Sequence, residues 1–496
     1  MSDAEFILAI DQGTTGTTCL LVDQSGSVRS RGYARVKSVY PQDGWVEQDA
    51  RDIWNSVLES ASEALGPNKP RLAGIGITNQ RETTVLWDSD TGEPLARAIV
   101  WQDRRTAGFC ERLIEDGYSQ TIADATGLVI DPYFSGTKVR WLLESDPGLA
   151  EAARSGRAKF GTVDSWLIWK LTGGNAHIVD ATNASRTMLC DIDRVAWSDD
   201  LLEILDVPSA MLPTIVPSSG DLAYTSGNGV IPAGIRIGGV AGDQQAALFG
   251  QVCFDPGMLK VTYGTGCFLL ANVGENRMRS KSRLLSTIAW RIGERTVYAI
   301  EGSVFMGGAV IQWLRDALRL IDSSEESESV ASEVNDTAGV TLVPAFVGLG
   351  APHWNARARG ILIGLTQGAT RAHIVRAALE SIAHQVADVA ETMAFESIPL
   401  ADKVRVDGGA SRNDLLMQIQ SDLLDTRVIR PAMIETTALG AAYLAGLAVG
   451  FWKSEDDLRS IWRIDREFSP SNDPTVLKRR HDWGRAVARS LDWADA

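Results

Sequence analysis

One short motif occurs twice, half a chain apart, and it constrains the fold more than any other feature. Each copy is an apolar strand, a turn of glycine and threonine, and a second apolar strand. The first copy runs through Phe6–Ile10, Asp11–Gly16 and Thr17–Val22, and the second through Leu259–Tyr263, Gly264–Cys267 and Phe268–Ala271. This pattern predicts two β-hairpins. Their similarity predicts an internal duplication, with each hairpin opening one domain and the boundary near Gly250.

Strand and helix patterns alternate around these hairpins. Leu72–Thr78 is typical of a buried strand, whereas Asp49–Leu65 and Ile374–Met393 carry apolar residues at helical spacing. Val404–Val406 and Asn413–Leu424 predict a strand and a helix separated by a glycine turn. Such alternation favours α/β layers. Because 496 residues exceed one typical core, we predict two α/β domains, residues 1–249 and 250–496.

Two polar segments are predicted to be solvated surface. Asp322–Glu333 is rich in serine and glutamate, and Lys478-Arg479-Arg480 is a short basic run of the kind that usually forms an exposed helix face. Neither segment suggests chemistry.

The composition excludes several classes of partner. The formal net charge of -15 argues against nucleic acid or an anionic membrane. The five cysteines are scattered without C-x-x-C spacing, which indicates reduced thiols in the cytoplasm. The first residues lack the basic region of a secretory signal, and the longest apolar run, Ala438 to Trp452, is too short to span a bilayer and is typical of a buried helix. The histidines form no cluster that predicts zinc.

The glycine and threonine turns are candidate phosphate sites. The sequence contains no G-x-x-x-x-G-K-[ST] loop. Glycine lets backbone N–H groups approach an anion, and threonine hydroxyls add donors without adding charge. Either turn alone could be an ordinary hairpin turn, but the repetition favours two turns that hold a polyphosphate from opposite sides.

Further motifs complete a resemblance. They are Asp11–Thr15, Thr78–Thr83, Trp101–Arg105, Asp131–Lys138, Gly242–Gln245, Tyr263–Phe268 and Arg405–Ala410. In this order and spacing the sequence resembles the glycerol kinases of the carbohydrate-kinase family, which is related to actin, Hsp70 and hexokinase. The resemblance extends from about residue 6 to residue 455.

The resemblance implies two actin-like (ribonuclease H-like) α/β domains with the active site in the cleft between them and a hinge near Gly250. It implies that ATP and Mg2+ are used to phosphorylate glycerol to sn-glycerol 3-phosphate, in a homo-oligomer (a dimer or tetramer). One departure is Thr18, which stands where the family often has an arginine near the phosphates.

The resemblance also implies a polyol site. Its residues would be Arg81, Glu82, Trp101, Tyr133, Asp243, Gln244 and Phe268. A guanidinium donates and a carboxylate accepts, so Arg81 and Glu82 suit vicinal hydroxyls. Neighbouring side chains on a strand point to opposite faces, so both reach one ligand only at a strand end, which the position after Leu72–Thr78 supplies. Alternatively, this pair is an interdomain salt bridge, and the aromatic residues belong to the core.

Asp243 is the predicted catalytic residue. An ordinary aspartate pKa near 4 is far below that of an alcohol, so Asp243 would orient the hydroxyl and accept its proton as the O–P bond forms. The alternative is an aspartate that only caps the helix predicted at Gln244–Phe249.

The nucleotide residues follow from the same resemblance. Thr14, Thr15, Gly16 and Thr265 would surround the phosphates, and Gly308, Gln312, Gly409 and Asn413 would line the adenosine pocket. Asp11 would hold Mg2+ through water, since Mg2+ keeps much of its hydration shell.

Three other functions remain open from the sequence. One is a kinase of the same family for another polyol or a pentulose, although Trp101 and the Arg81-Glu82 pair favour a small triol. A second is an ATPase of the actin or Hsp70 type that phosphorylates no polyol. A third is a catalytically silent regulator, against which Asp11 and Asp243 argue.

Overall fold

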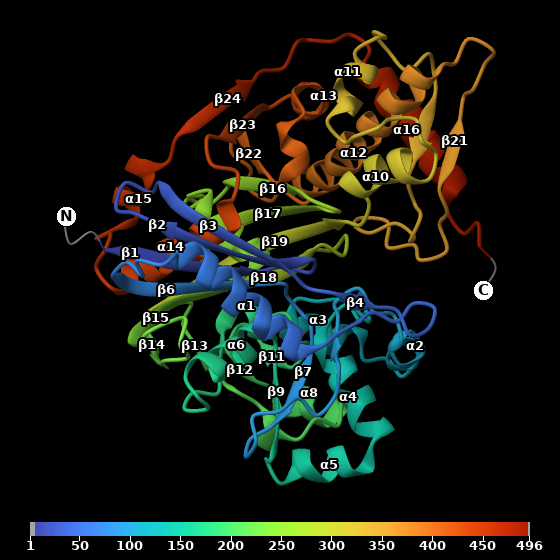
Figure 1. The fold of residues 1–496 in the computed structure, drawn as a ribbon. Coiled ribbons are helices and arrows are strands. Elements are labelled where there is room, and N and C mark those ends of the chain that lie inside the picture. Colours follow the sequence, from blue (N-terminus) through green and yellow to red (C-terminus); the bar gives the residue numbers. More distant parts are fainter. Residues whose placement is uncertain (1–4, 495–496) are drawn as a thin grey trace.

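The computed structural model describes residues 5–494, and its backbone is built around one 13-stranded mixed sheet (Figure 1). In spatial order the strands are β24 (Ile464–Phe468), β23 (Arg427–Pro431), β22 (Lys403–Asp407), β16 (Leu259–Tyr263), β17 (Cys267–Gly274), β19 (Arg295–Val304), β18 (Leu285–Ile292), β14 (Ser219–Ser226), β15 (Ala233–Gly242), β6 (Leu72–Asn79), β1 (Phe6–Gln12), β2 (Gly16–Val22) and β3 (Val28–Arg35).

The sheet consists of two halves that repeat one plan. β1 pairs antiparallel with β2 and parallel with β6, and β16 pairs antiparallel with β17 and parallel with β22. Both predicted hairpins are therefore confirmed. The halves meet where β14 lies beside β18, with a single paired position, Ser219 opposite Ile292. The strands from β24 to β18 come from the second half of the chain, and those from β14 to β3 come from the first half.

Helices cover the sheet. They are α1 (Ala50–Leu65), α2 (Ala107–Glu115), α3 (Ser119–Thr126), α4 (Ser135–Ser145), α5 (Pro147–Arg154), α6 (Val163–Leu171), α7 (Ala181–Ala184), α8 (Asp199–Ile204), α9 (Asp243–Gly250), α10 (Gly308–Asp316), α11 (Glu326–Ala331), α12 (Arg371–Phe395), α13 (Asp414–Leu424), α14 (Thr436–Ala448), α15 (Glu455–Ile461) and α16 (Val476–Ser490). In Figure 1, α10 to α13 and α16 gather over the C-terminal half, and α2 to α6 lie on the other side of the sheet.

Short strands and turns complete the layers. They are β4 (Ser38–Val39), β5 (Glu47–Gln48), β7 (Val85–Asp88), β8 (Ala98–Ile99), β9 (Ala158–Gly161), β10 (Ile178–Asp180), β11 (Cys190–Asp191), β12 (Ala196–Trp197), β13 (Thr214–Val216), β20 (Thr341–Val343), β21 (Ile361–Ile363) and the 3-10 turns η1 (Ser209–Met211) and η2 (Gly409–Arg412). The predicted α/β layering is confirmed.

The predicted helices form at the predicted positions. Asp49 caps α1, because its Oδ1 accepts the N–H of Arg51 at 2.9 Å. On the predicted apolar face of α1, Ile53 and Val57 are fully buried, and Trp54 and Leu58 are half-buried. The segment Ile374–Met393 lies within α12, and Asn413 caps α13.

Both predictions of solvated surface are partly wrong. Within Asp322–Glu333, α11 forms and buries Val330 against the core that contains α12. In the basic run, the Nη2 atom of Arg480 lies 2.7 Å from Asp388 and from Glu391 on α12, and Arg479 lies 3.4 Å from Glu380 on the same helix. These acidic partners come from elements distant in sequence, so the arginines attach α16 to α12 instead of facing water.

Helix α14 is largely buried, as expected for the apolar run that starts at Ala438. It contacts α9 and β6 without intervening side chains. A Cβ on Gly440 would lie 1.8 Å from the carbonyl oxygen of Ala246, and one on Gly76 would lie 2.0 Å from that of Ala441. Only glycine allows backbones to approach so closely. Because α9 begins at the predicted catalytic residue and β6 leads to the predicted polyol pair, this contact fixes the strand ends at the site.

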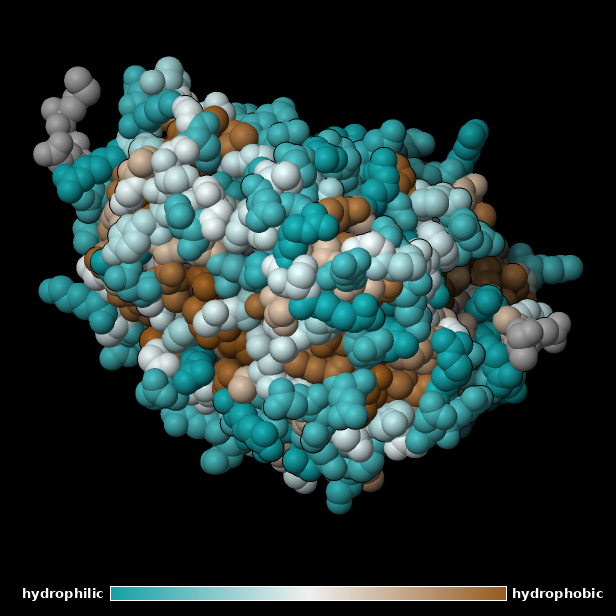
Figure 2. Space-filling view, turned by 90° about the horizontal axis from the view of Figure 1, so that it is seen from below, coloured by the Kyte–Doolittle hydropathy of each residue, from teal (hydrophilic) through white to brown (hydrophobic). Residues whose placement is uncertain are grey.

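The surface is mainly hydrophilic on the face that Figure 2 shows, with hydrophobic patches near the middle. The five cysteines are buried and form no disulfide among the described residues. In residues 5–494, no helix combines the length and the apolar character that a membrane crossing demands.

Candidate active site

The predicted polyol residues converge from both halves of the sheet. The Nε atom of Arg81 lies 3.1 Å from Oδ1 of Asp243, and its Nη2 atom donates to the hydroxyl of Tyr133 at 3.3 Å. The ring of Trp101 lies 5.6 Å from that of Tyr133 and 6.5 Å from that of Phe268. The structure therefore brings a donor, carboxylates and an aromatic wall together.

A sharp turn places Arg81 and Glu82 at one site. Strand β6 ends at Asn79, and Glu82 has a φ of 62°, in the left-handed region that a residue other than glycine seldom adopts. The turn breaks the strand alternation, so that both side chains enter the same cluster of buried charges. The strained residue follows the strand end that was predicted from the sequence. Backbone strain of this kind concentrates at functional sites.

Trp101 connects the polyol side of the site to the first glycine and threonine turn. Its indole N–H donates to Oγ1 of Thr14 at 2.9 Å. Phe268, whose ring faces Trp101, follows directly after the second turn in β17. The two turns therefore approach the same aromatic wall from opposite halves of the sheet.

Asp243 is the first residue of α9 and faces the site. Its Oδ1 atom accepts the N–H of the adjacent Gln244 at 2.7 Å. The N-cap of α9 is Gly242, so the alternative in which Asp243 caps this helix is wrong. The side chain is 30% exposed, whereas Arg81 beside it is 1% exposed. Burial raises the pKa of Asp243 above the usual aspartate range, although Arg81 and Lys260 oppose the rise. A raised pKa makes the carboxylate a better proton acceptor.

Lys260 is a site residue that the sequence reasoning missed. It is fully buried on β16, and its Nζ donates to Oε1 of Gln244 at 2.6 Å and to Oγ1 of Thr262 at 2.7 Å. Burial lowers the pKa of Lys260 to about 8, while Asp407 and Asp243 oppose the decrease. A lysine inside an otherwise apolar strand is the signal that could have revealed it, because lysine is almost never fully buried unless paired.

The sequence reasoning also missed two further buried charges. Arg186, in the loop after α7, and Glu301, within β19, are fully buried and contact Arg81 or Glu82. No turn or spacing motif marks either residue.

The second turn contacts the start of α10. The N–H of Gly308 donates to the carbonyl of Gly264 at 2.8 Å, and the N–H of Gly307 donates to that of Thr265 at 2.8 Å. The hydroxyl-bearing residue Thr265 stays exposed. A predicted phosphate residue and a predicted adenosine residue thus lie side by side.

Of the remaining predicted adenosine residues, Gly409 lies near the same strand end. Gly408, at φ 84°, would place a Cβ 2.5 Å from the carbonyl oxygen of Tyr263, so η2, which begins at Gly409, packs on the end of β16. Gln312 is exposed on α10. Asn413 is engaged elsewhere, since its Oδ1 accepts the N–H of Leu416 at 2.8 Å and caps α13.

The first turn is compact and polar. The N–H of Gly13 donates to the carbonyl of Gly16 at 2.9 Å, and a Cβ on Gly16 would lie 2.6 Å from the carbonyl oxygen of Ala34. Thr15 is exposed at the tip. Burial raises the pKa of Asp11 to about 8, and Asp243 and Glu435 add to the rise. The carboxylates of Asp243 and Glu435 therefore lie close enough to Asp11 to disfavour its negative charge.

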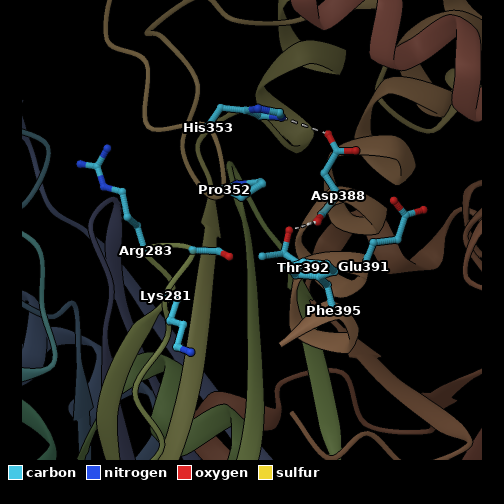
Figure 3. Close-up of a pocket in the computed structure, with 9 residues that line it drawn as sticks. Lys281, Arg283, Pro352, His353, Asp388, Glu391, Thr392 and Phe395 are labelled. Carbon is cyan, nitrogen blue, oxygen red and sulfur yellow. Dashed lines mark hydrogen bonds and ion pairs between the residues drawn. The ribbon is translucent and has the colours of Figure 1, made fainter. Parts of the chain in front are cut away.

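A hollow on the C-terminal half lies away from these residues. It has a volume of about 520 Å3 and is lined by residues of the loop before β18, the loop after β20, and α12 (Figure 3). Figure 3 shows His353 directed toward Asp388, 3.4 Å away, and Arg283 directed away from them. None of the predicted site residues lines this hollow, so the candidate site rests on the convergence of side chains described above.

Comparison with known proteins identifies the class. The N-terminal domain of the FGGY family of carbohydrate kinases matches residues 6–250, and the C-terminal domain of that family matches residues 259–449. The chain therefore belongs to the FGGY family of carbohydrate kinases, which confirms the resemblance predicted from the motifs.

Relatives within the family are more specific. The chain is 55% identical to a glycerol kinase of Dechloromonas aromatica and 53% identical to glycerol kinase 2 of Thermotoga maritima, with 99% of each chain covered in both comparisons. Its structure matches that of Plasmodium falciparum glycerol kinase with ADP at a TM-score of 0.91 and 35% identity, with 98% of each chain covered. A xylulose kinase from Lactobacillus acidophilus, at 21% identity and a TM-score of 0.86, shares the fold. The predicted pair of actin-like (ribonuclease H-like) domains is confirmed.

Proposed function

We propose that this chain is an ATP-dependent glycerol kinase that produces sn-glycerol 3-phosphate and ADP. One observation carries the proposal: the guanidinium of Arg81 lies 3.1 Å from the Asp243 carboxylate, beside the wall formed by Trp101 and Phe268. A donor, an acceptor and an apolar surface at this spacing suit a small molecule with adjacent hydroxyls. The relatives named glycerol kinase support the same substrate.

In this proposal each polyol residue has a distinct task. Arg81 donates to glycerol hydroxyls and Glu82 accepts from them. Trp101 and Phe268 would cover the carbon chain, and an aromatic wall there favours a small triol over longer sugars. Tyr133 and Gln244 complete the hydrogen bonds.

Asp243 orients the primary hydroxyl of glycerol and accepts its proton. Meanwhile the new O–P bond forms and the bond between the transferred phosphoryl group and ADP breaks. Because phosphoryl transfer has a loose transition state, positioning and charge neutralisation supply most of the acceleration. Closure about a hinge near Gly250, at the end of α9, would exclude water, which competes with the hydroxyl.

The nucleotide would be held between the two turns. Thr14, Thr15, Gly16 and Thr265 would donate to the phosphates, and Gly308, Gln312, Gly409 and Asn413 would lie near the nucleoside. Burial raises the pKa of Asp11 to about 8, so a bound dication would favour its ionised form, and the oxygen donors of this carboxyl group fit Mg2+. No group of three or more ligating side chains is present within residues 5–494, but Mg2+ commonly uses one or two carboxylates, waters and substrate phosphates. When bound, Mg2+ would neutralise phosphate charge.

The proposal extends to properties of the whole enzyme. We propose the domains 1–249 and 250–496, a cytoplasmic location and a homo-oligomer, as the sequence predicted.

The test is ADP release from ATP and Mg2+ with glycerol, with pentuloses and with no acceptor. We expect turnover that depends on glycerol and is at least tenfold slower with the pentuloses, because the wall of Trp101 and Phe268 leaves less room for a longer carbon chain. Equal ADP release without any acceptor would instead identify an ATPase of the actin type. Faster turnover with a pentulose would reject glycerol as the substrate.

A pH prediction follows from Lys260. Below about pH 8 its ammonium is charged and offsets the negative charge near Gln244, and above that pH the amine becomes neutral. We expect kcat/KM for glycerol to fall as the pH rises through this value. We expect Lys260→Met to lose roughly tenfold in kcat/KM, as for a missing charged hydrogen bond, and to lose this alkaline limb. An unchanged alkaline limb in the variant would assign the titration to another group.

A further inference from the structure

A ring of four buried charges lies behind the proposed glycerol site. It comprises Arg81, Glu82, Arg186 and Glu301, and each residue is at most 2% exposed. Glu301 comes from β19 in the C-terminal half of the sheet, whereas Arg81 and Glu82 follow β6 in the N-terminal half. The ring contains two guanidiniums and two carboxylates, so their formal charges cancel.

Glu301 binds both arginines of the ring. The Nη1 and Nη2 atoms of Arg81 donate to its carboxylate at 2.6 and 3.1 Å, and Nη2 of Arg186 donates to it at 3.0 Å. Burial favours protonation of Glu301, but Arg186 and Arg81 outweigh it and hold its pKa at about 2. Glu301 is therefore a permanent anion that anchors both guanidiniums.

Arg81 contacts the carboxylates of both Glu301 and Asp243, and more of its nitrogen atoms contact Glu301. Both Nη atoms face Glu301, and only Nε faces Asp243, at 3.1 Å. Bidentate contacts between arginine and a carboxylate are stronger than contacts through a single nitrogen atom. If Glu301 lost its charge, Arg81 would be free to pair fully with Asp243. A fully paired Asp243 would have a lower pKa and would be a weaker base.

Arg186 has the corresponding role for Glu82. Its Nε donates to Oε1 of Glu82 at 2.7 Å, and its guanidinium lies 5.6 Å from the ring of Tyr133 and 5.3 Å from that of Phe134. Contacts of a guanidinium with aromatic faces fix its plane. Arg186 therefore holds one oxygen of Glu82 and leaves the other for a ligand.

The charge state of Glu82 depends on this partner. Burial raises the pKa of Glu82, while Arg81 and Arg186 oppose the rise and Glu301 adds to it. The titratable or charged groups that face Glu82 are Arg81, Arg186, Glu301, Tyr133 and Lys138. Without Arg186, a buried carboxylate that has lost a partner would bind a proton more readily. A protonated Glu82 loses capacity as an acceptor of hydroxyl protons.

We propose that Glu301 and Arg186 are positioning residues for the reaction: Glu301 keeps Arg81 from neutralising Asp243, and Arg186 keeps Glu82 ionised and oriented. This proposal rests on the proposed function, and it makes the polyol site in one half of the sheet depend on a carboxylate from the other half. The two residues should affect different kinetic constants, because one acts on the base and the other on substrate binding.

The test compares Glu301→Gln and Arg186→Gln, using the polyol that the wild-type enzyme turns over fastest. We expect Glu301→Gln to reduce kcat roughly tenfold or more, with a smaller change in KM for the polyol. We expect Arg186→Gln to raise that KM roughly 10- to 100-fold, as for the loss of a charged hydrogen bond. In Arg186→Gln the KM should rise further as the pH is lowered, whereas the wild-type KM should stay flat over the same range.

The double variant distinguishes the effect of an unbalanced buried charge from a general disruption of the fold. Arg186→Gln with Glu301→Gln removes one charge of each sign, so we expect its loss of kcat/KM to be smaller than the product of the single losses. Glu380→Gln is the matched control, because Glu380 is also buried and paired with arginines, on α12. It should lower thermal stability and leave the polyol KM and its pH profile unchanged.

Three results would overturn the proposal. The first is single variants that keep the wild-type kcat, KM and pH profile, and the second is a double variant whose loss of kcat/KM equals or exceeds the product of the single losses. The third is an Arg186→Lys variant whose KM for the polyol rises at low pH as in Arg186→Gln. Arg186→Lys retains the charge and also serves if a neutral variant fails to fold. Failure of the proposed function is visible separately, because the wild-type enzyme itself would then prefer another acceptor or need none.

Discussion

Asp243→Asn is expected to reduce kcat by about 100- to 10,000-fold, the contribution typical of a positioned general base. The amide keeps the oxygen that accepts the N–H of Gln244 at 2.7 Å, so α9 should start unchanged. It cannot accept the proton of the primary hydroxyl, and it removes the charge that faces Arg81 at 3.1 Å. The measurement is steady-state ADP release at saturating glycerol and ATP.

Two comparisons make this result specific. KM for ATP and the thermal midpoint should stay close to those of the wild-type enzyme. Asp388→Asn provides the control, because Asp388 is also a largely buried aspartate paired with an arginine, 2.7 Å from Arg480, but it lies beside the hollow of Figure 3. We expect near-normal turnover from this control. If Asp243→Asn also turned over normally, Asp243 would not be the base.

Local sequence rules predicted the frame of this site well. Alternating apolar strands and glycine turns predicted β1, β2, β16 and β17, because short hairpins are determined by neighbouring residues. The strand end after β6 was predicted from the need for two adjacent side chains to reach one ligand. The structure supplies the physical means, a left-handed φ of 62° at Glu82.

The electrostatic support of the site could not be predicted in the same way. Glu301 is close to Arg81 only because β19 and β6 belong to one sheet, and Arg186 comes from a loop with no motif. Contacts between residues so distant in sequence leave no periodic signal. A buried charge within an apolar strand, as at Lys260 and Glu301, is the only local hint.

The same limit explains the errors. Arg480 was predicted to be solvated because a short basic run usually is, but Asp388 and Glu391 from α12 pair with it. Those partners become neighbours only after α16 docks on α12. The role predicted for Asn413 illustrates a different limit, since a residue that suits a nucleoside contact also suits a helix cap.

Gly440→Ala is expected to lower the free energy of unfolding by at least about 3 kcal/mol, the upper range for overpacking a core. The added Cβ would lie 1.8 Å from the carbonyl oxygen of Ala246. A backbone oxygen cannot rotate away as a side chain does, so α14 and α9 must separate. Urea unfolding followed by tryptophan fluorescence measures the change, and kcat should fall too because α9 begins at Asp243.

Gly484→Ala is the control that isolates the steric effect. Gly484 also lies inside a helix, α16, but a Cβ there would meet nothing within 4 Å. Alanine favours a helix over glycine by about 0.8–1.0 kcal/mol, so this variant should become more stable by nearly that amount. Helix propensity therefore predicts stabilisation at both positions, and only the contact with Ala246 reverses the sign at Gly440. A Gly440→Ala protein as stable as Gly484→Ala would mean that α14 does not contact α9 backbone to backbone.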